Sequence, residues 1–544
     1  MFIKKQIDML TGKVHEKERK AAFESLASHY WTIERLEARE VRELMETVNE
    51  CFFEPRYNVN EFNDMCYKFF ISCGNSNPEF WDRDFPFVIT TYDSGGNVRY
   101  KIDFKLLAAH VIDKGKYFFV GELIYLYDDA HGVYERVSNE MFRGYVLSFV
   151  NALSRSLSTT SGIDGAVKDI KSDRSHVIVV DDMDADMNLI NFQNGLLNLK
   201  TLELLPHSPE VFSTVQVKCN WNPDAEECTI FNDFLNTLLS GHDEMISFIW
   251  QYTGLAMSNI PGYKSKKALI LYGSGNTGKS RYYELLQRLI GGGNCCSISI
   301  NDLEERFGTS VLFGKRLAGD ADMKAMRVKE MSIFKKLTGG DPISFEFKGK
   351  DILSGIYKGL LLFCCNELPK FGGDKGEHVY ERMVILKCSN VIPAEKRDPM
   401  LIEKMCAELE SIAYYAVMYL KNFIEKGYSF DIPDSSKTEI QKYIIENDNV
   451  MQFLEECTVL REKAPNYQDV FTCANMYRAY VSWARDSGVY ICNKSEFVKS
   501  ACNYYKFDDA EKIRMKKSGK SFYWFVLKSD CYSLCGFADV DVEI

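Results

Sequence analysis

The chain has 544 residues, of which 46% are hydrophobic and 13% aromatic, with 66 Lys and Arg against 77 Asp and Glu and a formal net charge of -11. This composition is typical of a folded chain with sizeable cores and excludes an intrinsically disordered one. At roughly 100–200 residues per domain, the length predicts about three to five domains. The acidic total argues against a uniformly basic nucleic-acid coat protein, but it leaves a local basic channel open.

The lack of a secretory signal or membrane span and the number of cysteines predict a soluble cytoplasmic protein. The N-terminal residues become charged early and lack the apolar segment of a secretory signal. The apolar run 359–365 is far shorter than the roughly 18 residues of a membrane span. The 17 cysteines are odd in number, so free thiols in a reducing compartment are expected. Cys531 and Cys535 lack a second ligand pair, and buried thiols are favoured over a zinc site there.

The chain order of the predicted elements divides the sequence into four parts. Residues 1–100 combine charged helical patterns with an aromatic, turn-rich stretch and carry no chemistry that we can identify. Residues 101–225 mix helices with short strands, including a hairpin around Asn194-Gly195. Residues 226–440 open with a helical block and continue as alternating strands and helices, which indicates an α/β core with a parallel sheet. Residues 441–544 read as helices followed by a basic hairpin.

A phosphate-binding loop stands between a predicted buried strand, 268–272, and a predicted helix, 281–290. It fits G-x-x-x-x-G-K-[ST] in the strand, loop and helix context that this motif requires. Lys279 is expected to contact the β- and γ-phosphates of ATP, and the Ser280 hydroxyl to bind Mg²⁺. The loop consists of Gly273, Ser274, Gly275, Asn276, Thr277, Gly278, Lys279 and Ser280.

Two carboxylates lie at the end of the short predicted strand 312–322, about 40 residues after the loop. Asp320 and Asp322 alternate, so both would point to one face if the strand persisted to its end. Mg²⁺ prefers carboxylate oxygens, and the attacking water needs orientation. The residues do not decide which of the two contacts the metal.

Two further polar residues adjoin apolar strands. Asn366 ends the run 358–366 and is placed to hydrogen-bond the γ-phosphate or the attacking water, although Asn is also a common strand terminator. Arg382 precedes the next apolar run. It is a candidate site residue, and the alternative is an arginine that forms an ion pair on the surface.

Taken in order, these pieces resemble the superfamily-3 helicases, a branch of the AAA+ ATPases found in viruses, phages and plasmids. The resemblance is strongest to the helicase half of phage and plasmid primase–helicases, with the poxvirus primase–helicase and the papillomavirus replicative helicase as more distant relatives. It rests on the loop, the two carboxylates, the segment 334–350 with Thr338-Gly-Gly-Asp341, and the strand 360–366 followed by Arg382. An upstream block, 190–209, looks like the domain that precedes the helicase core.

The resemblance implies a role for each matching residue. Asp320 and Asp322 would form the second acidic motif, Asn366 the polar sensor, and Arg382 an arginine finger offered to the neighbouring subunit. Lys348 and Lys350 would lie on a hairpin that grips single-stranded DNA in the channel of a ring, usually of six subunits. Relatives often have adjacent carboxylates, whereas Ala321 separates them here.

The C-terminal part carries a local basic excess. From Lys494 to Lys528 there are nine Lys or Arg against four Asp or Glu. Three helices and a basic hairpin predict a winged-helix-like domain, with a solvated charged turn as the alternative. The hairpin residues expected at DNA are Arg514, Lys516, Lys517 and Lys520.

The acidic run 177–186 resembles a polymerase metal site only superficially, because no supporting basic or His residues lie nearby. The first 100 residues are too short for the primase domain of the family, so no primer synthesis is expected from this chain alone.

The leading hypothesis is a ring-forming, ATP- and Mg²⁺-dependent replicative DNA helicase of a mobile element, acting on single-stranded and forked DNA in the cytoplasm of a bacterial host. A separate primase or host replication proteins would be its partners, and no membrane is involved. The alternatives are an ATP-switched DNA-binding initiator or loader without processive unwinding, and a non-enzymatic scaffold, which the intact loop disfavours.

Overall fold

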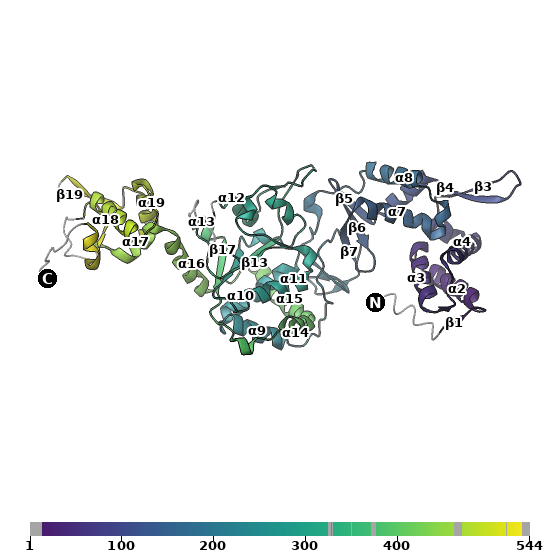
Figure 1. Cartoon of the computed structure of the whole chain (residues 1–544), viewed down its shortest axis with the longest axis horizontal. Coiled ribbons are helices and arrows are strands. Elements are labelled where there is room, and N and C mark those ends of the chain that lie inside the picture. The colour runs from purple at the N-terminus through teal and green to yellow at the C-terminus, as the bar shows by residue number, and fades with distance from the viewer. Residues whose placement is uncertain are drawn as a thin grey trace.

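The computed structural model describes residues 13–324, 328, 330–349, 351–371, 377–461, 471–517 and 519–535. The chain is elongated, with the N-terminal helices at one end, a sheet-containing core in the middle and a small C-terminal part at the other end (Figure 1). Within the described residues, no helix has the length and apolar character needed to cross a membrane.

A five-stranded parallel sheet forms the centre of the core, as the alternation of strands and helices predicted. Its strand order is β12-β13-β16-β11-β17, and every neighbouring pair is parallel. The strands are β11 (Ala268–Tyr272), β12 (Cys295–Ser297), β13 (Leu317–Met323), β16 (Leu360–Cys365) and β17 (Met383–Lys387). β13 starts later than the run 312–322 suggested, because residues 308–312 form a 3-10 helix.

Both faces of this sheet are buried, which explains why its strands read as nearly continuous apolar runs. One face packs with α9, α10, α11, α14 and α15 in one hydrophobic cluster. The other face packs with α12 and α16 in a second cluster. The helices are α9 (Thr229–Leu238), α10 (Asp243–Met257), α11 (Lys279–Ile290), α12 (Ser332–Gly339), α13 (Glu377–Tyr380), α14 (Leu401–Ala407), α15 (Leu409–Glu425) and α16 (Asp434–Asn447).

The N-terminal part has its own core, in which aromatic side chains from residue 23 to residue 149 pack together. This core contains residues on both sides of the predicted boundary at residue 100. Its helices are α2 (Arg19–Ser28), α3 (Ala38–Cys51), α4 (Val59–Ser76), α5 (Pro78–Asp84), α6 (Phe104–Lys114), α7 (Asn139–Leu153) and α8 (Thr160–Ser172). Its strands are β1 (Val14–His15), β2 (Phe53–Glu54), β3 (Val88–Tyr92), β4 (Val98–Ile102), β5 (Tyr117–Val120), β6 (Leu123–Asp128) and β7 (Val133–Val137).

A small antiparallel sheet connects the N-terminal part to the core. The predicted hairpin around Asn194-Gly195 is confirmed, with Ile190 paired to Leu197. The nearby carboxylate Asp184 accepts hydrogen bonds from the backbone N–H and the hydroxyl of Thr214, at 2.7 and 2.5 Å, so it fastens a loop. The strands are β8 (Leu189–Phe192), β9 (Gly195–Asn198) and β10 (Leu204–Leu205).

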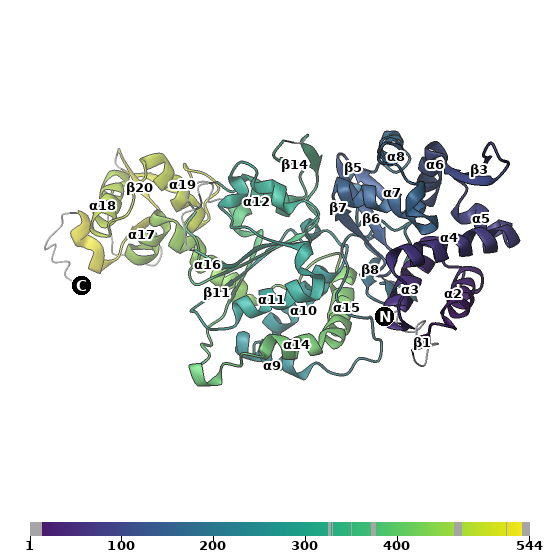
Figure 2. The same cartoon turned by 45° about the vertical axis from the view of Figure 1, so that its right-hand side comes forward.

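The C-terminal part consists of three helices, a strand pair and a hairpin, attached to the core through α16 (Figure 2). The first strand, β18, pairs antiparallel with the last, β21, and β19 pairs with β20 as the basic hairpin. The elements are α17 (Asn449–Cys457), β18 (Thr458–Leu460), α18 (Cys473–Asp486), α19 (Lys494–Tyr505), β19 (Arg514–Lys517), β20 (Lys520–Tyr523) and β21 (Phe525–Leu527).

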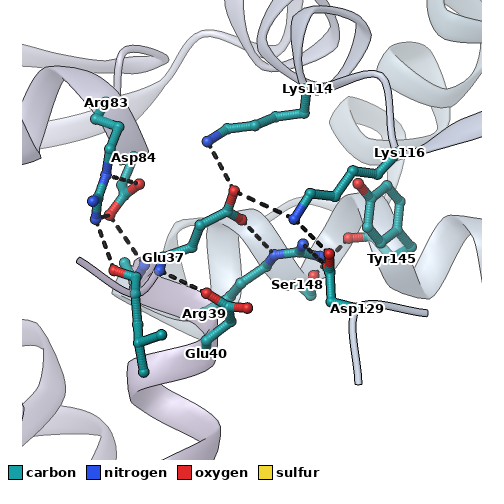
Figure 3. Close-up of polar contacts among 12 residues, drawn as sticks. Glu37, Arg39, Glu40, Arg83, Asp84, Lys114, Lys116, Asp129, Tyr145 and Ser148 are labelled. Atoms are coloured by element: carbon teal, nitrogen blue, oxygen red, sulfur yellow. Dashed lines mark hydrogen bonds and ion pairs between the residues drawn. The ribbon is translucent and has the colours of Figure 1, made fainter. Parts of the chain in front are cut away.

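Ion pairs join α3 to the elements that follow residue 100 (Figure 3). The Glu37 carboxylate lies 2.9 Å from Lys114 Nζ and 2.9 Å from Arg39 Nε. Lys116 Nζ lies 2.8 Å from the Asp129 carboxylate and 3.9 Å from that of Glu37. No local sequence pattern indicates this cluster, since its charges come from separate segments.

The cluster makes the N-terminal part sensitive to acid. Burial alone would raise the pKa of Glu37, but Arg39, Lys114 and Lys116 outweigh it and lower the pKa to about 2. The ordinary value is 4.5, so this contribution to stability is present above about pH 4.5 and is lost as pH falls toward 2.

We predict that Glu37→Gln lowers the free energy of opening of α3 by about 3 kcal/mol at neutral pH. Amide hydrogen exchange of α3 in the full chain measures this quantity, and the difference from wild type should shrink as pH falls toward 2. Glu24→Gln, which removes an exposed carboxylate 3.9 Å from Lys20, is the matched control and should change little. Equal effects of the two substitutions would contradict a special role for the cluster.

Candidate nucleotide-binding and DNA-binding sites

The predicted phosphate loop lies between β11 and α11, and it requires glycine at both ends. Gly273 has φ +141°, and a Cβ there would lie 2.2 Å from the carbonyl oxygen of Cys388. Gly278 has φ +104° and precedes the first residue of α11, where a Cβ would lie 3.1 Å from Phe234. Any other residue would be strained at either position.

The backbone of the loop presents free hydrogen-bond donors. The N–H groups of residues 274–280 donate to no acceptor within the described part of the chain. They surround the N-terminus of α11, where the helix dipole favours negative charge. Successive N–H groups at a helix N-terminus are the usual donors to phosphate oxygens. The loop therefore has the geometry that a nucleotide phosphate requires.

Lys279 is 6% exposed and folds back over this loop. Its Nζ donates to the carbonyl oxygens of Gly273 and Ser274, at 2.7 and 2.9 Å, and to Thr277 Oγ1 at 3.2 Å. These three acceptors are neutral. A largely buried ammonium group held by neutral acceptors is well suited to an incoming anion.

The strand with the predicted carboxylates lies directly beside the loop. Ser280 Oγ donates to the carbonyl oxygen of Ala321 at 2.9 Å. Asp320 and Asp322 flank Ala321, and Asp320 Oδ1 accepts from the backbone N–H of Asp322 at 2.9 Å. One hydroxyl and two carboxylates form an oxygen-only donor set, which is the set that Mg²⁺ prefers.

A bulge at the end of β13 changes the expected orientation of the two carboxylates. Asp320 pairs with Phe363, and Met323 pairs with Cys365, so β13 has one residue more than β16 over this stretch. The strand therefore does not persist regularly, and the expectation that both carboxylates share one face does not apply.

Asp320 and Asp322 lie near different cysteines of β16. Burial chiefly raises the pKa of Cys364, and among the nearby charges Asp320 raises it further. Burial also raises the pKa of Cys365 to about 12, with Asp322 as its nearby carboxylate. Successive strand residues alternate between faces, and Cys364 belongs to the cluster that contains α11. Asp320 pairs with Phe363, which belongs to the cluster that contains α12, so the register of β13 places Asp320 on the face opposite α11 and leaves the metal contact open between the two carboxylates.

Asn366 is exposed at the end of β16, next to the strand that carries the loop. It lines a cleft together with Tyr272, Lys387 and Glu439. The Tyr272 hydroxyl donates to the Glu439 carboxylate of α16. Sequence reasoning missed α16 as a neighbour of this site, because nothing in its polar pattern indicates what it packs against.

Arg382 lies at the end of the strands opposite to the phosphate loop. Its carbonyl oxygen accepts from the N–H of Ala268, at the start of β11, whereas the phosphate loop follows Tyr272 at the end of that strand. Five strand residues span roughly 13–17 Å. Arg382 is therefore separated by a full strand from the phosphate loop of its own chain.

The predicted channel hairpin is formed by β14 (Ile343–Phe345) and β15 (Leu353–Gly355), and it projects from the core beside the N-terminal part (Figure 2). Lys348 is exposed in its loop, and Lys350 lies outside the described residues. Phe345 is 2% exposed and packs on Phe313. Phe345 therefore belongs to the core of this part of the protein.

The aromatic side chain next to Lys348 ties the hairpin to the N-terminal part. Phe347 packs against Phe313 with ring centroids 5.6 Å apart. The guanidinium of Arg136, from β7, lies 5.8 Å from the Phe347 ring centroid.

The basic residues of the C-terminal hairpin are exposed. Arg514 and Lys516 alternate with Met515 along β19, and the Arg514 guanidinium lies 5.8 Å from the Tyr523 ring centroid. Lys517 pairs with Lys520 next to the turn. The hairpin thus presents positive charge on both of its strands.

These features define an α/β protein with a five-stranded parallel sheet and a P-loop core. Residues 96–240 match the family described as "D5 N terminal like", and residues 271–382 match a "Family of unknown function (DUF5906)". The chain therefore carries a D5-like primase–helicase N-terminal region followed by a DUF5906 region that spans the phosphate loop, the carboxylates and Arg382. The resemblance to phage primase–helicases is confirmed at this level.

Two solved structures of the C-terminal region of NrS-1 are similar to this chain. One apo structure has a TM-score of 0.47 with 12% sequence identity and covers 78% of this chain and 99% of its own. An A-form apo structure has a TM-score of 0.45 with 12% identity and covers 79% of this chain and 100% of its own.

We predict that Lys279→Ala weakens ATP binding by about tenfold or more, because a charged donor to the phosphates is lost. Isothermal titration calorimetry of the full chain measures the change. Lys168→Ala, which removes an exposed lysine on α8, is the control and should bind ATP like wild type. Unchanged affinity of the Lys279 variant would exclude the loop as the phosphate site.

Proposed function

We propose that the chain is an ATP-driven DNA helicase of the superfamily-3, AAA+ type, which assembles into a ring, most simply a hexamer, and moves on single-stranded DNA. The observation that carries the proposal is the separation of the phosphate loop from Arg382, which has no ion pair with any described carboxylate. The two lie at opposite ends of the strands of one parallel sheet. Such a chain completes its hydrolytic site by contact with a second copy. We place its action in DNA replication of a phage, plasmid or other mobile element in the bacterial cytoplasm.

The roles within one subunit follow from the contacts around the loop. The backbone N–H groups and Lys279 would bind the ATP phosphates, and Ser280 with one of the two carboxylates, Asp320 or Asp322, would hold Mg²⁺. Mg²⁺ offsets the negative charge of the phosphates when it is bound. The other carboxylate and Asn366 would orient the attacking water at the ends of β13 and β16.

Arg382 supplies charge to the neighbouring subunit. It has no ion pair with any described carboxylate, and its Nε is buried without a hydrogen-bond partner. The side chain as a whole is only half-buried, so part of the guanidinium is accessible to a partner outside the chain. The γ-phosphate of ATP on the next subunit is an anion of the required kind, and an arginine there stabilises the charge of the transition state.

Two basic hairpins supply contacts to DNA. Lys348 and Lys350 at the β14–β15 loop would face the channel, where copies from several subunits hold phosphates without reading sequence. We infer a winged-helix-like C-terminal domain from the pairing of β18 with β21 and the basic β19–β20 hairpin, and this domain would contact duplex DNA.

The exposed C-terminal hairpin also favours a second candidate, an ATP-switched initiator or loader that binds duplex DNA and does not unwind it processively. Strand displacement on a forked substrate separates the two. Product that accumulates with ATP turnover supports the helicase, and ATP-dependent binding without displacement supports the initiator.

We predict that Lys279→Ala and Arg382→Ala each abolish ATP hydrolysis, and that mixing the two inactive proteins restores part of it. In mixed rings, an intact loop on an Arg382 variant meets an intact arginine on a Lys279 variant. Phosphate release is measured after the two proteins are mixed and allowed to exchange subunits. Self-mixed samples of each variant are the control, and a mixture as inactive as these would contradict an arginine that acts between subunits.

We predict that Lys348→Ala weakens binding to single-stranded DNA and reduces its salt dependence. Each phosphate contact contributes about 0.7 to the slope of log K against log salt, so the slope should fall by about that amount for each hairpin engaged. Fluorescence anisotropy over a salt series measures both changes. Lys168→Ala is again the control, and an unchanged slope would remove Lys348 from the DNA site.

A further inference from the structure

The segment Thr338-Gly339-Gly340-Asp341, which is distinctive in the sequence, forms the C-terminal end of α12 and the turn after it. Nothing above assigns it a role. It lies at the same end of the strands as Arg382, because Arg382 hydrogen-bonds directly to residues of α12. The contacts between the two show what the segment does.

The arginine is held by the last turn of α12. Arg382 Nη1 donates to Thr338 Oγ1 and to the carbonyl oxygen of Lys335, both at 3.2 Å. The negative end of the helix dipole favours a cation at this end of α12. The Thr338 hydroxyl is 3% exposed and donates to the carbonyl oxygen of Phe334 at 2.8 Å, which leaves its oxygen free to accept from the arginine.

The two glycines leave room for this arrangement. A Cβ at Gly339 would lie 3.3 Å from Arg382 Nη1 and 3.0 Å from the Asp341 carboxylate. Gly340 has φ +78°, and a Cβ there would lie 2.7 Å from the ring of Tyr263. A larger residue at Gly339 would displace the guanidinium, and one at Gly340 would move the turn itself.

The acceptors in this socket are neutral. A hydroxyl and a carbonyl orient the guanidinium without neutralising it, whereas a carboxylate would compete with phosphate for the same charge. The socket therefore fixes the direction of the arginine and keeps its charge available. It also joins the arginine to the DNA hairpin, because only Asp341 and Pro342 separate α12 with its turn from β14.

We propose that Thr338, with the carbonyl oxygen of Lys335, forms a socket that positions Arg382 for the γ-phosphate of the neighbouring subunit. Thr338 is a positioning residue, since it acts through Arg382 and touches no nucleotide. The proposal rests on the proposed function, in which Arg382 acts between subunits. It assigns the Thr-Gly-Gly segment to the arginine side of the hydrolytic site.

The test uses Thr338→Val, which keeps the shape of the side chain and removes the hydroxyl. A mispositioned arginine weakens the transition state more than ATP binding, so kcat for ATP hydrolysis should fall about tenfold with little change in KM. Thr338→Ser retains the hydroxyl and should recover most of the rate. Gly339→Ala leaves the hydroxyl intact but crowds the guanidinium, and it should lower kcat in the same way.

Subunit mixing places the defect on one side of the site. Thr338→Val mixed with Lys279→Ala should recover activity, because each protein supplies what the other lacks. Thr338→Val mixed with Arg382→Ala should recover none beyond the residual rate of Thr338→Val, because both defects lie on the arginine side. Native mass spectrometry of each mixture checks that rings form.

The outcomes separate the two proposals. If Lys279→Ala and Arg382→Ala complement each other but Thr338→Val also complements Arg382→Ala, the socket is wrong and the trans arginine stands. A valine variant with unchanged kcat, or a serine variant as slow as valine, also overturns the socket. If Lys279→Ala and Arg382→Ala fail to complement, the trans arginine fails and the socket falls with it.

Discussion

The length of a β-strand separates the phosphate loop from Arg382, and the proposed hydrolytic site depends on this separation. β11 and β17 lie side by side in register, with Ala268 beside Met383 and Tyr272 beside Lys387. The phosphate loop leaves one end of this pair, and Arg382 enters at the other. A rigid sheet cannot bring the two ends of its strands together, so Arg382 cannot reach phosphates bound at the loop of its own chain. The proposed dependence on a neighbouring subunit, and the proposed ring, rest on this constraint.

Different helices hold the phosphate loop and Arg382 in place. At the loop end, a serine hydroxyl joins α11 to the carboxylate strand, and α16 contacts the strand end through Tyr272 and Glu439. At the other end of the strands, α12 holds Arg382 and leads through a short turn into the β14–β15 hairpin. The N-terminal part contributes Arg136 against Phe347 of that hairpin, while its own helices are joined by the ion pairs around Glu37.

Much of the core could be predicted from the sequence, because its signals are local. The predicted strand 268–272 has the bounds that the structure shows, since an apolar run ended by a glycine loop leaves little choice. The basic C-terminal hairpin was predicted for a similar reason. The phosphate loop follows from residue spacing, and its free N–H groups are what the spacing implies. The boundaries between domains stay predictions.

Other features could not be predicted, because they depend on contacts between distant residues. Arg382 and Thr338 are 44 positions apart, and neither residue indicates the other. The bulge after Asp320 appears only when β13 is paired with β16. The ion pairs around Glu37 bring together residues from before and after position 100, where the sequence showed ordinary charged helices. Such contacts are properties of packing, and a single sequence does not encode them in any local pattern.

The central claim is that one chain holds only half of a hydrolytic site, and its most direct test is the specific rate of ATP hydrolysis as a function of protein concentration. Mass photometry on the same samples records the fraction of assembled rings. The account predicts that the rate per subunit falls toward zero as rings dissociate and follows the ring fraction. A constant rate per subunit in samples that contain only monomers would contradict it.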